Sequence, residues 1–184
     1  MEVCSAAIPE IKLITPRRFT DARGFFCETY HKRRFAEAGL AVEFVQDNVS
    51  VSRFRGVVRG LHYQVPPAGQ AKLIWVVRGA IFDVAVDLRR SSTTFGQHVA
   101  MVLSASEGRH LFVPEGFAHG FAVLEPDTEV HYKTSNYYSP QHERGVFWGD
   151  PALGIAWPIR SEEAILSDKD ARLPPLSQQP DLFP

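Results

Sequence analysis

The chain has 184 residues, of which 22% are charged and 11% are aromatic, so we expect one folded domain spanning 1–184 and exclude a disordered chain. Twenty Lys and Arg residues balance twenty-one Asp and Glu residues, and a net charge of -1 gives no field that attracts nucleic acid or a membrane surface. An anionic ligand must therefore meet local cations.

The N-terminus and the cysteines indicate the compartment. Met1–Ile14 lacks the basic start and long apolar run of a signal peptide, and no apolar stretch approaches the length that spans a bilayer. Cys4 and Cys27 have neither a metal-ligand spacing nor the density of a disulfide framework. We expect a cytoplasmic protein without a membrane partner.

The first 42 residues precede the main sheet-forming part of the chain. The segment 8–30 is rich in strand-forming residues and is suited to adding a strand to the sheet of a second copy, which predicts a homodimer. His31–Ala38 is the one good helical segment, and Gly39 follows it where a left-handed C-terminal cap is expected.

From Glu43 onward, runs of Val, Ile, Phe and Tyr alternate with turn residues about every ten positions, which predicts an all-β sandwich or barrel of antiparallel strands. Strands are expected at Val57–Gln64, Lys72–Val77, Ala80–Leu88, Gln97–Leu103, Phe117–Leu124 and Thr128–Tyr137.

Two details refine this pattern. The short turn at Arg78-Gly79 predicts a hairpin between its flanking strands. In the last strand, Val130, Tyr132 and Thr134 share one face.

The tail 173–184 holds four prolines and is expected to pack on the surface or on a partner subunit.

Two stretches resemble the paired motifs of the cupin family, a jelly-roll β-barrel in which three His and one Glu hold a metal. Gly56 and His62 have the spacing of the first motif, but Gln64 stands where its second His belongs, and no Glu follows. The second motif is better kept, over Gly108–Gly116 and at His119. Two remaining imidazoles are a poor site for Zn²⁺ or Fe²⁺, so we expect a cupin-like jelly roll with no metal and no cofactor.

A closer resemblance covers nearly the whole chain, from Ile8 to about Leu173. The stretches that carry it are Asp21–Phe26 with Glu28, Phe44–Asn48, Arg59–Gln64, Phe82–Asp87, Pro114–Phe121, Tyr132–Tyr138 and Leu166–Asp170. Together they resemble the dTDP-4-dehydrorhamnose 3,5-epimerase family. The resemblance implies an isomerase that converts dTDP-4-dehydro-6-deoxy-D-glucose to dTDP-4-dehydro-L-rhamnose in dTDP-L-rhamnose biosynthesis.

The resemblance also implies catalytic roles, which fit the chemistry of inverting a carbon beside a ketone. That chemistry needs a base, an acid on the opposite face, and a cation that steadies the enolate. His62 is the implied base, oriented by Asp170. Tyr132 is the implied acid, Lys72 neutralises the enolate, and His119 helps to hold or polarise the same oxygen. Taken alone, each residue also fits an ordinary packed or solvated position.

Substrate binding is implied in the same way. The matching positions are Arg23, Glu28, Gln46, Asn48, Arg59, Lys72, His119, Glu143 and Lys169. In the family the N-terminal segment reaches the neighbouring site, so Arg23 and Glu28 would act across a dimer interface. Tyr137 or Phe26 is suited to packing on the base or the sugar.

Strand parity conflicts with one of these assignments. In a regular strand Arg59 and His62 point to opposite faces, yet the resemblance brings both to the substrate. A bulge at Gly60 would restore a common face, so we predict an irregularity there.

Three alternatives stay open. One is an epimerase of a single carbon in another deoxysugar pathway, and a second is a non-catalytic sugar-nucleotide-binding protein. The third is a metal-dependent cupin, which Gln64 and the absent Glu disfavour.

Overall fold

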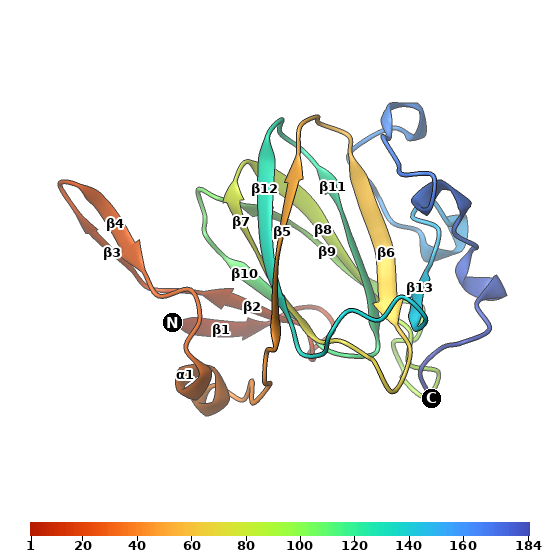
Figure 1. Ribbon diagram of the computed structural model, residues 1–184, viewed down its shortest axis with the longest axis horizontal. Coiled ribbons are helices and arrows are strands. Elements are labelled where there is room, and N and C mark those ends of the chain that lie inside the picture. The colour runs from red at the N-terminus through yellow and green to blue at the C-terminus, as the bar shows by residue number, and fades with distance from the viewer.

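The computed structural model describes residues 1–184 and contains two large sheets and a separate hairpin (Figure 1). The order of the six-stranded sheet is β1 (Glu2–Ser5), β2 (Lys12–Thr15), β10 (His110–Val113), β7 (Lys72–Arg78), β12 (Thr128–Thr134) and β5 (Gln46–Ser52). The order of the five-stranded sheet is β13 (Glu143–Gly145), β6 (Val58–Gln64), β11 (Phe117–Val123), β8 (Ala80–Asp87) and β9 (His98–Ser104). All neighbours within the sheets pair antiparallel.

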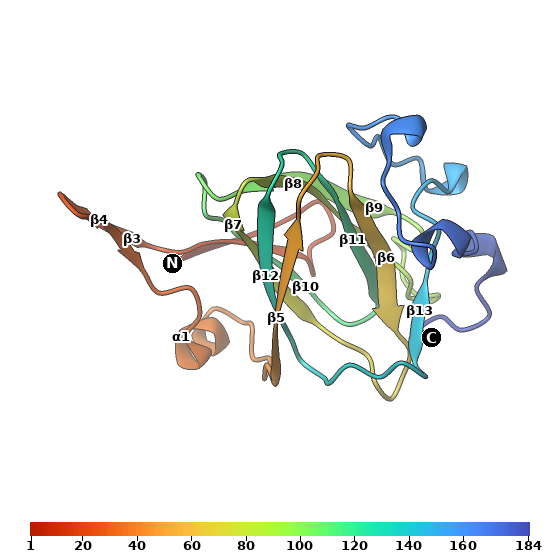
Figure 2. The ribbon, with the colours of Figure 1, turned by 45° about the horizontal axis from the view of Figure 1, so that its top comes forward.

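The two sheets face each other, and the main core lies between them (Figure 2). Its 14 buried residues come from both sheets, for example Ile74 and Leu111 from one and Ile81 and Phe121 from the other. Each strand alternates sides, so one face of each sheet supplies this apolar layer. The expected all-β jelly-roll-like architecture is confirmed.

The predicted hairpin between β7 and β8 is wrong. β7 pairs with β10 and β12, whereas β8 pairs with β9 and β11, so the chain crosses from one sheet to the other at Gly79. Gly79 has a φ of +76°, and a Cβ there would lie 2.2 Å from the Thr128 hydroxyl oxygen. Alternation shows which side chains share a face but not which strand lies alongside.

Other boundaries differ less. The helix α1 (Lys32–Glu37) has His31 as its N-cap, and Gly39 has the expected left-handed backbone with a φ of +84°. The strand expected to reach Tyr137 ends at Thr134, because the backbone bends at Ser135. No helix has the length and apolarity to cross a membrane.

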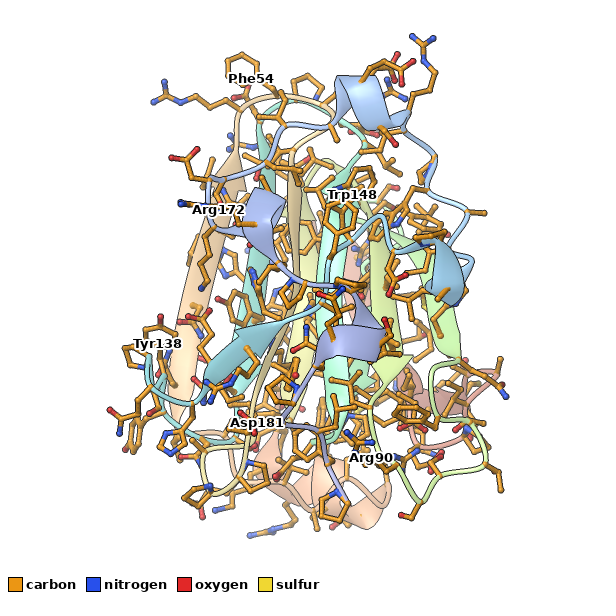
Figure 3. The ribbon with its side chains drawn as sticks, turned by 90° about the vertical axis from the view of Figure 1, so that its right-hand side faces the viewer. Phe54, Arg90, Tyr138, Trp148, Arg172 and Asp181 are labelled. Carbon is orange, nitrogen blue, oxygen red and sulfur yellow. The ribbon has the colours of Figure 1, made fainter.

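The C-terminal segment, residues 146–184, covers the outer face of the five-stranded sheet with four 3-10 turns, η1 (Pro151–Leu153), η2 (Ser161–Glu163), η3 (Asp170–Arg172) and η4 (Leu176–Gln178). Figure 3 looks onto this face, where Trp148, Arg172 and Asp181 mark the segment. Phe183 is buried in its own chain, and the Tyr63 hydroxyl donates to the side chain of Gln179 at 3.0 Å. The tail therefore packs on the surface of its own chain. This is one of the two arrangements that the sequence predicted, the other being packing on a partner subunit.

The N-terminal segment divides into two parts. β1 and β2 extend the chain's own six-stranded sheet. The hairpin of β3 (Arg18–Asp21) and β4 (Gly24–Cys27) instead projects away from both sheets (Figures 1 and 2). Phe19, Phe25 and Phe26 on it are 51%, 58% and 68% exposed. Within 1–42, this hairpin is the part that pairs with neither large sheet of its own chain and is open to a second subunit.

Candidate active site

A cavity between the two sheets has two lobes that meet at three side chains. The first lobe has a volume of about 640 Å³ and the second about 240 Å³. His62, Lys72 and Tyr132 line both lobes. Three of the four predicted catalytic residues therefore lie at one junction, and the fourth, Asp170, lines the first lobe.

These side chains come from opposite walls. His62 on β6 and His119 on β11 belong to the five-stranded sheet, where they are directly paired across the two strands. Lys72 on β7 and Tyr132 on β12 belong to the six-stranded sheet that faces them. The alternation in β12 correctly predicted that Tyr132 shares its face with the buried Val130.

The predicted irregularity in β6 is confirmed. His62 pairs with His119 and Arg59 pairs with Phe121, so three steps along β6 match two along β11. Gly60 has a φ of +122°, and a Cβ there would lie 2.6 Å from the Gly120 Cα. This bulge turns Arg59 to the same side as His62, and both line the first lobe.

His62 is held by a carboxylate from the C-terminal segment. Its Nε2 lies 2.6 Å from the Oδ1 of Asp170, the first residue of η3. Burial alone raises the pKa of Asp170, but hydrogen bonds from His62, Ser167 and the Gly60 amide outweigh it and leave that pKa below its ordinary value. An ionised Asp170 accepts the proton on Nε2, so Nδ1 of His62 is the nitrogen left to act as a base.

A second histidine–aspartate pair lies beside the first. The Nε2 of His119 lies 2.9 Å from both oxygens of Asp83, and Asp83 is fully buried. Sequence reasoning missed Asp83. Both faces of β8 are covered, and the apolar face with Val84 and Val86 packs under the C-terminal segment, so the face toward the cavity is the one that carries Asp83. The available signal was the position of Asp83 inside Phe82–Asp87, a stretch that carries the family resemblance, on the side of the strand opposite Val84 and Val86.

Lys72 and Tyr132 have shifted acidities. Burial lowers the pKa of Lys72 to about 8, against the opposing carboxylates of Asp83 and Glu143. Its Nζ donates to the His62 carbonyl oxygen at 3.4 Å. Burial raises the pKa of Tyr132, which keeps the phenol protonated at neutral pH. The site thus holds a neutral proton donor beside a cation, which remains charged below pH 8.

The predicted substrate-binding residues divide between the lobes, with Arg59, His119 and Lys169 on the first and Lys72 on both. Gln46, Asn48 and Glu143 line the second, and the Gln46 amide donates to the Asn48 oxygen at 2.8 Å. Lys169 lines the first lobe and forms an ion pair of 2.5 Å with Glu143, so this pair lies between the lobes. The hydrogen bonds from Lys169 and Tyr138 outweigh burial and hold the pKa of Glu143 below its ordinary value.

Two polar atoms in the cavity lining have no partner within the chain. They are the Nδ2 of Asn48 and the Oγ of Ser50, two inward-facing positions of β5, and both are buried. Buried polar groups are nearly always hydrogen-bonded in proteins, so these atoms are suited to a bound ligand or water. Ser50 was not anticipated from the sequence.

Arg23 and Glu28 are not part of this cavity in the single chain. Arg23 pairs with Asp21 at 2.6 Å on the projecting hairpin, and Glu28 pairs with Arg34 at 2.8 Å beside α1. Neither Phe26 nor Tyr137 lines a lobe, whereas Tyr138 lines the second.

Comparison with known proteins places the chain in a family. The family model for dTDP-4-dehydrorhamnose 3,5-epimerases matches residues 5–178. The chain belongs to this family. The dTDP-4-dehydrorhamnose 3,5-epimerase of Shigella flexneri is 51% identical over 171 residues, which cover 92% of this chain and 93% of that protein.

Solved structures of epimerases in the family have the same fold. The dTDP-6-deoxy-D-glucose-3,5-epimerase of Legionella pneumophila, in complex with dTDP-4-keto-L-rhamnose, has a TM-score of 0.92 and 44% identity, covering 96% of this chain and 93% of that one. The dTDP-4-dehydrorhamnose 3,5-epimerase of Bacillus anthracis, with TDP and pyrophosphate bound, has a TM-score of 0.92 and 50% identity, covering 95% and 98%.

The epimerase site contains no cluster of metal-ligating side chains. No group of three or more His, Cys, Asp or Glu residues is arranged to hold an ion. The Nε2 atoms of His62 and His119 each face a carboxylate of their own, and Gln64 bonds to backbone groups. That this epimerase works without a metal or cofactor stays a prediction.

Proposed function

We propose that the chain converts dTDP-4-dehydro-6-deoxy-D-glucose to dTDP-4-dehydro-L-rhamnose by inverting C3 and C5, in dTDP-L-rhamnose biosynthesis. One observation carries the proposal: a histidine–aspartate pair on one sheet faces a tyrosine and a lysine on the other, across a single cavity. Family membership supports the same reaction, and the Legionella relative binds dTDP-4-keto-L-rhamnose.

The proton transfers follow from this arrangement. Nδ1 of His62 removes the proton from the carbon beside the C4 ketone, and the electron pair of that bond moves to the ketone oxygen as an enolate. Lys72 neutralises the enolate, with His119 on the opposite wall of the cavity. Tyr132 then donates its proton to the opposite face of the carbon, and the ketone re-forms. Solvent restores both side chains, so the reaction consumes no oxidant or reductant.

The nucleotide is bound by local charges, because the protein has almost none overall. Arg59 and Lys169 line the first lobe and are suited to the diphosphate. Asn48, Gln46 and Glu143 offer polar contacts in the second lobe.

The same proposal includes a homodimer in the cytoplasm. The exposed Phe25 and Phe26 on the projecting hairpin suit burial against a second copy, which would carry Arg23 and Glu28 to that copy's cavity. Both cysteines are unpaired, which fits a reducing compartment. Sedimentation at micromolar concentration tests the dimer, and a monomer with full activity contradicts it.

The deciding experiment incubates the purified protein with the 4-keto-6-deoxyglucose nucleotide in heavy water and locates deuterium by NMR. Deuterium at C3 and C5 with formation of the L-sugar supports the double epimerase. Exchange at one carbon identifies a single-site epimerase, and binding without exchange identifies a sugar-nucleotide-binding protein. Activity that depends on a metal, found by metal analysis with chelation, contradicts the proposed mechanism.

A further inference from the structure

Gln64 occupies the position at which the cupin motif has its second histidine ligand. It lies on β6 two residues after His62, so both side chains point to the same side of the strand. Its side chain lines the second lobe, yet the residue is only 3% exposed. The role of an amide at this position is not accounted for by the proton transfers.

The Gln64 amide forms three hydrogen bonds, all to backbone groups. Its Nε2 donates to the carbonyl oxygens of Ala68 at 2.6 Å and Tyr137 at 3.1 Å. Its Oε1 accepts from the N–H of Ser139 at 2.7 Å. Two donors and one acceptor are thus in use at once, which an amide can supply and a single neutral imidazole cannot.

These bonds hold the chain on both sides of Tyr138. The carbonyl before Tyr138 and the N–H after it are both bound by Gln64, and the N–H of Tyr138 itself donates to Gln46 at 3.0 Å. Tyr138 lies on the connection between β12 and β13, at the edge of the molecule (Figure 3). Without these contacts, an exposed connection would sample many backbone conformations.

The fixed backbone aims the tyrosine ring at the site. Tyr138 is 53% exposed and lines the second lobe, and its hydroxyl donates to Glu143 at 2.8 Å. Glu143 in turn pairs with Lys169 of the first lobe. The orientation of Tyr138 therefore connects to a charged pair that lies between the two lobes.

We propose that Gln64 is a positioning residue that holds Tyr138 as a preformed wall of the second lobe. The side chain at the position of the second cupin metal ligand thus holds the backbone of the loop 135–141 through hydrogen bonds. We call this set of hydrogen bonds the clamp. Substrate then meets an ordered surface and does not have to order this loop on binding, which favours affinity. The identity of the substrate rests on the proposed function, whereas the clamp itself does not.

The first test replaces Gln64 by an isosteric acid. Gln64→Glu loses both donors and places a carboxylate against two carbonyl oxygens, so we expect KM to rise about tenfold with kcat within about twofold of the parent. Gln141→Glu is the matched control, because Gln141 is exposed on the same loop and its side chain makes no hydrogen bond. We expect unchanged kinetics in the control. Gln64→Met repeats the test without a buried charge.

The second test asks whether Gln64 acts through Tyr138. Adding Gln64→Met to Tyr138→Ala should raise KM no further, because the residue being positioned is already gone. An additive effect contradicts the proposal, as does a fall in kcat that matches the rise in KM.

The third test needs no substrate. Amide hydrogen exchange of the free protein should speed up in the peptide covering 135–141 in Gln64→Glu and Gln64→Met, and not in Gln141→Glu. Unchanged exchange there overturns the clamp. Because this measurement is independent of turnover, an inactive parent protein would count against the proposed function and leave the clamp to be judged by exchange.

Discussion

Two histidine–aspartate pairs lie next to each other, with both histidines on the five-stranded sheet, and they differ in how exposed they are to solvent. In the first pair, the side chain of His62 is 29% exposed and bonds to one oxygen of Asp170 at 2.6 Å. In the second, the side chain of His119 is 8% exposed and contacts both oxygens of the fully buried Asp83 at 2.9 Å. The first joins β6 to a distant C-terminal turn, and the second joins two adjacent strands.

The difference shows that burial decides what such a pair can do. A partly open imidazole with one nitrogen free can gain and lose a proton during turnover. In the closed pair, removing either partner leaves a buried polar group or charge without its partner and without water. We therefore assign proton transfer to the first pair and the support of the cavity wall mainly to the second.

The largest expected effect comes from His62→Asn. Asparagine can still donate to Asp170 but cannot accept a proton, so exchange and inversion at both carbons should fall by up to about 10⁴-fold. Affinity for dTDP, measured by calorimetry, should change little, because the base acts on the barrier and not on the ground state. Deuterium exchange near the parent rate would show that His62 is not the base.

The next largest effect separates the pairs by stability. His119→Ala leaves the Asp83 carboxylate buried without its hydrogen-bond partner, so the free energy of unfolding should fall by about 3 kcal/mol. His62→Ala should cost less, because Asp170 keeps hydrogen bonds from Ser167 and Gly60. Urea unfolding of both variants measures the difference. Equal losses would show that the two pairs are equivalent in the fold.

Local sequence patterns predicted much of the first pair's setting. The alternation in β12 grouped Tyr132 with Val130, which is a property of a single strand that local spacing can encode. The helix cap at Gly39 was predictable for the same reason. The irregularity at Gly60 was predicted correctly, but only because strand parity conflicted with the family resemblance over Arg59 and His62.

Contacts between distant segments were not predictable in this way. Asp170 lies 108 residues from His62, and only the family resemblance suggested their pairing. Asp83 was missed because β8 is covered on both sides, so an apolar face does not identify the interior. The pairing of β7 and β8 failed because periodicity does not specify the neighbouring strand.

A third expected effect concerns Tyr132, on the six-stranded sheet that faces both pairs. Tyr132→Phe removes only the hydroxyl, so the enolate should still form and His62 should return deuterium to the original face. Inversion should fall by about 10²-fold or more, while exchange falls less. NMR of the product in heavy water measures both rates. Inversion and exchange at parent rates would mean that Tyr132 is a packing residue and that another group donates the proton.

The smallest expected effect concerns Lys72. This residue contacts His62 of the first pair, and its pKa depends on the charge of Asp83 in the second pair. Its Nζ donates to the His62 carbonyl, and its pKa of about 8 reflects burial opposed by the carboxylates of Asp83 and Glu143. Because this pKa is lowered, the cation is present below pH 8 and is lost as the pH rises through that value. We expect kcat/KM to fall about tenfold per pH unit above pH 8. Lys72→Arg, although less active, should lack this alkaline decline, because arginine stays charged.

The same pH profile shows whether the closed pair influences the open one. The charge of Asp83 favours the protonated lysine, so Asp83→Asn should lower the pKa of Lys72 further and move the alkaline decline to lower pH. The substitution keeps the side-chain shape, so the second pair can still form a hydrogen bond. Activity near pH 6 should then change less than activity near pH 8. If the decline stays at its parent position, Lys72 does not respond to Asp83, and the second pair does not act through the lysine.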